Sequence, residues 1–376
     1  MEKTEVGELK LDRILLYNFK NYANAELVFD HPIVCLLGNN GSGKTNLLDA
    51  IHYLSVTKSF FNQVDSQNIL REFDQCSIQG EFTKNKEPET ILCSIRKNQK
   101  KIVKRNFKEY ERLADHIGQI PSVIVTPYDI ELIWEGSETR RKFLDATISQ
   151  QSKKYLDNLV QYNHALAQKN NLLKQFAQRG GYDELLLEPW DYRLISHGNV
   201  IHEARKSFAQ DFTKTFESIY DHISSGKEKP EITYLSELNQ KSLEQLLTDS
   251  REKDRVLERT TAGIHRDDLD FTLDGYSLKK MASQGQQKSF LFALKLAQHQ
   301  FISDHLLLSP ILMLDDLFDK VDEGRVNRIL SWLKNNVKAQ IFITDTHVQR
   351  IPAMLKAMNF DHEVWKISDS SVEKIG

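Results

Sequence analysis

The sequence has little cysteine and no long apolar run, and both absences narrow the classes of protein it can be. Among 376 residues, the cysteines Cys35, Cys76 and Cys93 lack the spacing and the neighbouring histidines of a zinc site or disulfide framework. We expect them to be small buried residues in strands. No stretch approaches the roughly 20 apolar residues of a membrane span, and the N-terminus lacks a signal peptide's apolar core. The expected location is the cytoplasm, with no membrane partner.

An excess of positive charge is also missing. The formal net charge is −3 and the isoelectric point is about 6.5, so any contact with nucleic acid must come from a local basic face. With 40% hydrophobic and 27% charged residues, the composition is typical of globular proteins. The length predicts two or three domains.

The strongest motif is a glycine-rich loop in residues 33–51, between an apolar run and leucines at helical spacing. Gly38, Gly43, Lys44 and Thr45 stand at the spacing of a P-loop. Glycines let backbone N–H groups close around phosphate oxygens, and the following helix presents its positive end to the same anion. We expect Lys44 to reach the β- and γ-phosphates and Thr45 to hold Mg²⁺. The whole predicted loop comprises Gly38, Asn39, Asn40, Gly41, Ser42, Gly43, Lys44, Thr45 and Asn46.

A P-loop requires a carboxylate partner at the end of another buried strand, and the sequence I-L-M-L-D-D supplies two. We expect Asp315 to hold Mg²⁺ through water and Asp316 to orient or deprotonate the attacking water. An ordinary polar strand end is the alternative for the same pair.

A second phosphate-binding helix end is predicted at residues 283–288, S-Q-G-Q-Q-K. Ser283, Gly285 and Gln286 offer a hydroxyl and backbone groups at a helix N-terminus. One γ-phosphate is not easily held by two helix ends of the same chain, so the pattern indicates an ABC-type ATPase that binds ATP between two subunits. We expect Asp322 in the loop that crosses this dimer interface, and His347 as the γ-phosphate sensor.

The middle of the chain predicts an inserted helical arm. Leu159, Leu166 and Leu173 recur every seven residues, as in a short coiled-coil seam, and a return helix is expected to start at Glu188. The predicted fold is α/β: an ABC-type P-loop ATPase head with a β-rich subdomain and an inserted short antiparallel helical arm. The expected domains are 1–130 (N-terminal part of the head), 131–227 (arm) and 228–376 (C-terminal part of the head).

Two basic segments are candidates for contact with DNA. Residues 96–108 interleave lysine and arginine with a turn and an aromatic residue, and a solvated basic hairpin is an equally good interpretation. Arg140, Arg141 and Lys142 form the second candidate.

Taken together, these motifs resemble the RecF family of bacterial recombination mediators, in the SMC/Rad50 branch of ABC ATPases. The resemblance extends over almost the whole chain, through residues 18–22, the P-loop, 58–60, 126–133, 140–145, 161–162, 168–170, 263–269, 283–288 and 314–322. Asp316 replaces the glutamate common in ABC ATPases. We expect this shorter carboxylate to accompany slow hydrolysis.

The resemblance implies a weak, DNA-dependent ATPase that dimerises on ATP and binds duplex DNA beside single-stranded gaps. It also implies work with RecO and RecR to load RecA, in recombinational repair, replication restart and the SOS response. Another SMC/Rad50-like ABC ATPase of DNA maintenance is the alternative. In a transporter ATPase subunit the P-loop and the second phosphate-binding helix end, the ABC signature, would be much closer together in the sequence than they are here. A structural SMC protein would need a much longer coiled coil, and a nuclease would need a further cluster of metal ligands.

Overall fold

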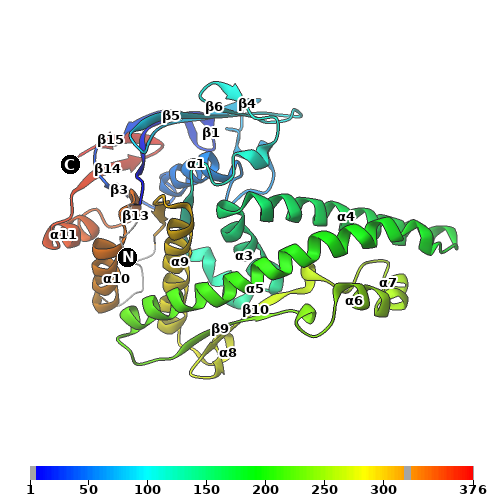
Figure 1. Cartoon of the computed structure of the whole chain (residues 1–376). Coiled ribbons are helices and arrows are strands. Elements are labelled where there is room, and N and C mark those ends of the chain that lie inside the picture. The colour runs from blue at the N-terminus through cyan, green and yellow to red at the C-terminus, as the bar shows by residue number, and fades with distance from the viewer. Residues whose placement is uncertain (1–5, 317–322, 376) are drawn as a thin grey trace. The chain divides into compact units, whose positions relative to one another are not determined.

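The computed structural model describes residues 6–316 and 323–375 and contains two compact units (Figure 1). The head unit comprises residues 1–130, 218–227 and 284–376, and the arm unit comprises residues 131–217 and 228–283. The expected boundary at residue 130 recurs here, but the expected third segment differs. Residues 228–283 belong to the arm unit because their strands and buried aspartates pack onto the arm helices, whereas residues 218–227 belong to the head unit.

A mostly parallel sheet forms one layer of the head unit. Its strand order is β15 (Ser371–Lys374), β14 (His362–Ser368), β3 (Ile33–Leu37), β13 (Ile341–Asp345), β12 (Ile311–Leu314) and β8 (Ser122–Val125). Only the β14–β15 pair is antiparallel, and β3, β12 and β13 are buried along their whole length, as expected of parallel strands covered on both faces. The carboxyl ends of these three strands therefore lie at one edge, and the P-loop, Asp315 and Asp345 lie there too.

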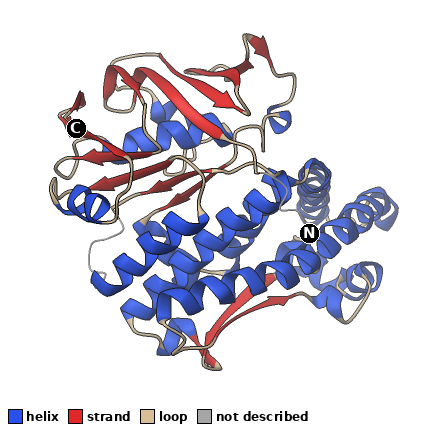
Figure 2. Cartoon of the chain, turned by 60° about the vertical axis from the view of Figure 1, so that its left-hand side comes forward, coloured by secondary structure: helices blue, strands red, loops and turns tan. Residues whose placement is uncertain are grey.

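An antiparallel sheet forms a second layer of the head unit (Figure 2). Its order is β2 (Tyr22–Val28), β1 (Leu9–Phe19), β4 (Gln75–Lys84), β5 (Glu87–Arg96), β6 (Ile102–Arg105) and β7 (Lys108–Glu109). Buried and less buried residues alternate along β4 and β5, so one face packs on the core and the other faces solvent.

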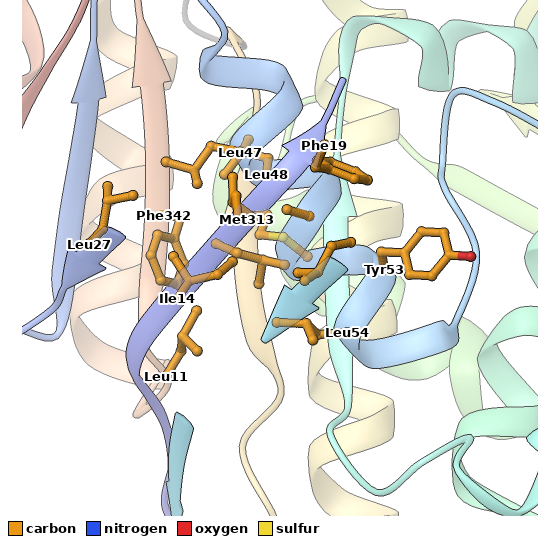
Figure 3. Packing of buried hydrophobic residues seen from close by; sticks show 14 of the residues in the cluster. Leu11, Ile14, Phe19, Leu27, Leu47, Leu48, Tyr53, Leu54, Met313 and Phe342 are labelled. Atoms are coloured by element: carbon orange, nitrogen blue, oxygen red, sulfur yellow. The ribbon is translucent and has the colours of Figure 1, made fainter. Parts of the chain in front are cut away.

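The helix that follows the P-loop, α1 (Lys44–Val56), packs between the two sheets. Figure 3 shows Leu47, Leu48 and Leu54 of α1 among core residues of both sheets, including Ile14 and Met313. The three cysteines are free and buried in β3, β4 and β5, as predicted from their isolation in the sequence.

Three further helices complete the description of the head unit: α9 (Gln284–Leu306), α10 (Glu323–Asn336) and α11 (Arg350–Ala357). Most of α9 is buried, which explains its run of apolar residues without a polar face. Within residues 6–316 and 323–375, no helix combines the length and apolar character needed to cross a membrane.

Helices dominate the arm unit. They are α2 (Glu131–Trp134), α3 (Ser137–Gln151), α4 (Lys153–Arg179), α5 (Glu188–Ser224, whose last turns belong to the head unit), α6 (Leu243–Asp249), α7 (Arg251–Leu257) and α8 (Leu278–Met281). A three-stranded antiparallel sheet accompanies them, in the order β11 (Tyr276–Ser277), β10 (Asp268–Leu273) and β9 (Pro230–Leu235). The predicted return helix from Glu188 is confirmed.

The seam of α4 differs from the predicted leucine heptad. Leu173 is buried as predicted, but Leu159 and Leu166 are only partly buried. Tyr155, Tyr162 and Lys169 are almost fully buried at the same seven-residue spacing. The aromatic rings supply more apolar area than leucine, and the lysine is paired, so the contact face is rotated from the leucine positions. The seven-residue spacing and the buried Leu173 are confirmed, whereas Leu159 and Leu166 do not form the centre of the seam.

A buried arginine joins the separate parts of the arm unit. Arg205 of α5 is 1% exposed and donates to the carboxylates of Asp145 and Asp267 at 2.8 and 2.7 Å. It also donates to the Tyr155 hydroxyl at 3.0 Å and the Ile264 carbonyl at 2.7 Å. Segments 140–145 and 263–269, which are part of the resemblance to the RecF family, thus contain residues that hold the arm unit together.

Candidate nucleotide-binding site

The P-loop connects β3 to α1 in a conformation that only glycine tolerates at its crowded positions. Gly43, the residue before α1, has φ 114°, and a Cβ there would lie 2.7 Å from the Tyr22 hydroxyl. A Cβ on Gly38 would lie 2.1 Å from the carbonyl oxygen of Ile367. Both contacts are too close for any side chain, so these two glycines of the motif are required by packing as well as by phosphate approach.

The loop is prepared to hold an anion. The first N–H groups of α1 have no partner within the helix, and the helix dipole is positive at this end. Among the described residues, the buried Ser42 hydroxyl has no hydrogen-bond partner. Lys44 is 6% exposed, and its ammonium donates to the carbonyls of Gly38 and Asn39 at 2.7 and 2.9 Å. Burial lowers the pKa of Lys44, while nearby aspartates favour its charged form.

Residues from the β1–β2 turn and the β14–β15 turn brace the loop. Tyr22 donates its hydroxyl proton to the Gly43 carbonyl at 3.0 Å. The Asn21 side chain accepts from Asn46 at 2.6 Å and donates to Ser370 at 2.8 Å. Asn46 was predicted as part of the loop, whereas its contact with Asn21 was not predicted. The family-like segment 18–22 was the available signal for Asn21 and Tyr22.

A buried aspartate in α1 fixes another family-like segment. Asp49 is fully buried and accepts from the Ser59 hydroxyl at 2.6 Å and the Phe60 N–H at 2.7 Å. Its carboxylate also lies 2.6 Å from the Lys20 ammonium. The segments 18–22 and 58–60 are therefore positioned against the helix that starts at the P-loop.

The predicted pair of carboxylates lies beside the P-loop. Thr45 donates its hydroxyl to Asp315, with both carboxylate oxygens at 3.0 Å, and Thr344 donates to the same carboxylate at 2.8 Å. Burial raises the pKa of Asp315, and these two hydrogen bonds act in the opposite direction. Asp316 has φ 47°, and its N–H donates to the Thr344 hydroxyl at 2.8 Å. Asp315 thus contacts Thr45 directly, and Asp316 is the last residue described before position 323.

The donor set at Thr45 and Asp315 fits Mg²⁺. A hydroxyl and a carboxylate are hard oxygen ligands, and Mg²⁺ ordinarily completes its octahedron with phosphate and water oxygens. Over the described ranges, no three or more histidine, cysteine, aspartate or glutamate side chains gather as a metal site.

His347 follows the carboxyl end of β13, at the same edge of the sheet. Its side chain is exposed, and its N–H donates to Asp345 at 3.0 Å. Arg350 donates to the other oxygen of Asp345, also at 3.0 Å. Asp345 was not among the predicted site residues, although it stands in the T-D-T-H segment that contains His347.

Ser283, Gly285 and Gln286, the residues of the predicted second phosphate-binding helix end, lie at the start of α9. Ser283 is the last residue of the arm unit and directly precedes the helix, while Gly285 and Gln286 lie in its first turn. The Gly285 carbonyl accepts from Arg325 of α10 at 2.6 Å, and Arg325 also contacts the Ser289 hydroxyl. The structure therefore anchors Gly285 through α10. The predicted interface residue Asp322 lies outside the described residues.

In the described part of the chain, three of the seven cations in residues 96–108 are paired with carboxylates, and all three cations of the second candidate make hydrogen bonds or ion pairs. In residues 96–108 the pairs are Lys97–Asp74 (3.0 Å), Lys101–Asp65 (3.1 Å) and Arg105–Glu89 (2.6 Å). In the second candidate, Arg140 binds Asp268 with two hydrogen bonds, Arg141 donates to the Asp267 carbonyl, and Lys142 lies 2.7 Å from Glu138. These contacts favour a structural role for Arg140 and Arg141 and leave only part of the first segment open to an anion.

Comparisons with known proteins agree along the whole chain. The family model described as RecF/RecN/SMC N terminal domain matches residues 10–363. The DNA replication and repair protein RecF of Parabacteroides distasonis is 44% identical over 363 residues, which cover 96% of this chain and 98% of that protein. A solved structure of the recombination mediator protein RecF with ATP, in the RecFOR pathway, has a TM-score of 0.89 at 30% identity and covers 98% of both chains.

A more distant match bears on the fold alone. The Smc head domain derived from Pyrococcus furiosus has a TM-score of 0.57 at 16% identity, and the match covers 98% of this chain and 96% of that one. The predicted ABC-type ATPase head with an inserted helical arm is thereby confirmed. The family model spans most of the chain and a nearly full-length relative shares 44% of its residues, so the chain belongs to the RecF family.

Proposed function

We propose that two copies of this chain bind ATP and Mg²⁺ between them, and that the closed dimer holds duplex DNA beside single-stranded gaps during recombinational repair and replication restart. The observation that carries the proposal is the P-loop itself. Its buried Ser42 hydroxyl has no partner among the described residues, Lys44 is held by loop carbonyls, and Thr45 is already joined to Asp315. The solved RecF structure with ATP supports the choice of nucleotide.

Each residue of the site has a separate task in this proposal. Lys44 exchanges the carbonyls of Gly38 and Asn39 for β- and γ-phosphate oxygens. Thr45 and Asp315 hold Mg²⁺, which neutralises phosphate charge when bound. Asp316 orients or deprotonates the attacking water, and His347 contacts the γ-phosphate. The partner subunit supplies the helix end with Ser283, Gly285 and Gln286, and Asp322 lies at the same interface.

The proposed partners follow from the family. RecO and RecR are proposed because the matched RecF structure belongs to the RecFOR pathway, and loading of RecA is the proposed outcome. ATP hydrolysis would be slow, stimulated by DNA, and would control DNA release in the cytoplasm. Closure of two copies also explains how a chain of net charge −3 can retain DNA, because two modest basic surfaces meet in one groove.

The test is ATP-dependent retention of a gapped duplex by three forms of the protein. Lys44→Ala is expected to lose both nucleotide binding and retention of the DNA. Ser283→Arg is expected to bind nucleotide with unchanged affinity but to lose retention, since its added side chain blocks the approach of the partner's phosphate. Retention of gapped DNA by Ser283→Arg at the wild-type level would contradict closure in trans.

A further inference from the structure

A row of four residues crosses the solvent face of the antiparallel sheet in the head unit. Tyr17 of β1 is paired with Ser77 of β4, Ser77 with Ser94 of β5, and Ser94 with Ile102 of β6. In β1, β4 and β5 the residues on both sides of these positions are buried in the core. Because side chains alternate between the faces of a strand, the row of four lies on the opposite, outer face.

The row forms the floor and the ends of a pocket of about 300 Å³. The serines are small and lie between two larger apolar side chains, Tyr17 and Ile102, which are 48% and 39% exposed. The volume is at the small end of the range for ligand pockets, so it suits one nucleotide unit rather than a duplex. The result is a slot with hydroxyl groups at its base and an aromatic ring at one side.

Two cations line the same pocket. Arg96 lies opposite Gln75 in the register of β4 and β5, and Lys100 and Gln99 lie in the turn that follows β5. Among the described residues, neither Arg96 nor Lys100 has a carboxylate within ion-pair distance, although Lys97 in the same turn is paired with Asp74. The available positive charge of this turn is therefore concentrated at the pocket.

We infer that this pocket binds one unpaired nucleotide of a DNA strand, with the base against Tyr17 and the phosphate at Arg96 and Lys100. An exposed ring beside cations is the combination that proteins use for single strands, since every base has a face to stack and every nucleotide carries a phosphate. The carboxamides of Gln75 and Gln99 can bond to base edges. Bases in a duplex are stacked inside the helix, so the ring selects an unpaired strand. The inference rests on the proposed role in DNA binding and locates the single-stranded part of it.

The test measures binding of a fluorescent thymidine oligonucleotide to the full-length protein in the absence of ATP. Tyr17→Ala is expected to weaken binding about tenfold, within the range for loss of one base–aromatic stack, and Tyr17→Phe is expected to preserve it. Arg96→Ala and Lys100→Ala are each expected to reduce the slope of log affinity against log salt by about 1. Lys97→Ala, in the same turn but paired with Asp74, is the matched control and should leave the affinity unchanged.

Two results would overturn the inference. One is that Tyr17→Ala binds the oligonucleotide with the same affinity as the wild-type protein and unfolds at the same temperature. The other is loss of binding to a polyglutamate peptide in Arg96→Ala with no loss for the oligonucleotide, which would assign the pocket to an acidic protein segment. Omission of ATP separates this test from the dimer proposal, because failure of ATP-dependent closure would not alter oligonucleotide binding by the monomer.

Discussion

At the scale of single residues, burial decides the protonation of a histidine that is remote from the nucleotide site. His299 of α9 is 1% exposed, and its Nε2 atom lies 2.9 Å from the Pro310 carbonyl, where it donates as a neutral ring. Burial lowers the pKa of His299 from 6.5 to about 4. The unfolded chain therefore binds this proton more readily than the folded chain does.

The consequence is a specific loss of stability in acid. The contribution of His299 is fully present above pH 6.5 and is lost as the pH falls toward 4, and it amounts to roughly 3 kcal/mol in the free energy of unfolding. His299→Gln, which keeps a donor but cannot titrate, should make the fall between these pH values shallower by that amount. Urea unfolding at a series of pH values measures it. Identical pH profiles for the two proteins would contradict a neutral buried His299.

The choice of aspartate at position 316 is a second residue-scale feature. Its backbone is held by Thr344, and its side chain is one methylene shorter than the glutamate of many ABC ATPases. We expect Asp316→Glu to hydrolyse ATP faster, because the longer carboxylate reaches closer to the attacking water. Asp316→Asn should lower turnover by about 10²-fold or more, since it removes the base. Unchanged turnover in Asp316→Glu would contradict this account.

The sequence predicted these sites unevenly at the residue scale. The P-loop and the pair of aspartates were predictable because their chemistry requires fixed residue types at fixed spacing. The brace from Asn21 to Ser370 was not, since it joins residues 349 positions apart and no local pattern records such a contact. The carboxylate contacts of Asp49 and Asp345 are local in the sequence, but no motif of fixed spacing marks them, so they were missed as well.

At the scale of elements, the arm unit depends on the buried charge of Arg205. Arg205→Met removes the partner of Asp267, which is 2% exposed, and leaves that carboxylate buried and uncompensated. Loss of one member of such a pair typically costs about 3–5 kcal/mol, so we expect a reduction of that size in the free energy of unfolding. Lys206→Met, at the exposed neighbouring position, is the control and should change it little. Equal denaturation midpoints for Arg205→Met and the wild-type protein would contradict a structural role for Arg205.

The contact between α9 and α10 leads to another element-scale prediction. Arg325 holds the first turn of α9 through the Gly285 carbonyl, and this turn contains the proposed trans-acting residues. Arg325→Ala should weaken ATP-dependent dimerisation roughly tenfold, since a hydrogen bond to a charged group contributes about 1.5–3 kcal/mol. ATP affinity of the monomer should not change, because the P-loop is intact. Normal dimerisation would contradict the positioning role.

The elements also show where a sequence pattern is ambiguous. The return helix was predictable, because Leu194, Ile201 and Phe208 recur at helical spacing and all are buried. The buried seam of α4 was less predictable, because a leucine heptad pattern does not include Tyr162 or the paired Lys169. Lys169 lies 2.7 Å from Asp191, which is why a charged side chain can occupy a core position.

At the scale of the whole molecule, the order of strands and helices was sufficient to predict the ATPase head. Parallel buried strands, a P-loop and an acidic strand end leave few alternative topologies. The division into units was less predictable, since residues 228–283 follow the arm in the chain and pack with it through long-range contacts to Asp267. Local composition gives no sign of that packing.

The central claim is that two chains share each bound ATP, one through Lys44 and Thr45 and the other through the helix end after Ser283. Sedimentation of the protein with saturating non-hydrolysable ATP analogue and Mg²⁺ tests it most directly, with Lys44→Ala as the control that cannot respond. With the analogue and Mg²⁺ bound, we predict that the wild-type protein shifts from a 43.6 kDa monomer to a dimer of twice that mass, and that Lys44→Ala stays monomeric. A wild-type protein that remains monomeric at saturation would contradict the account.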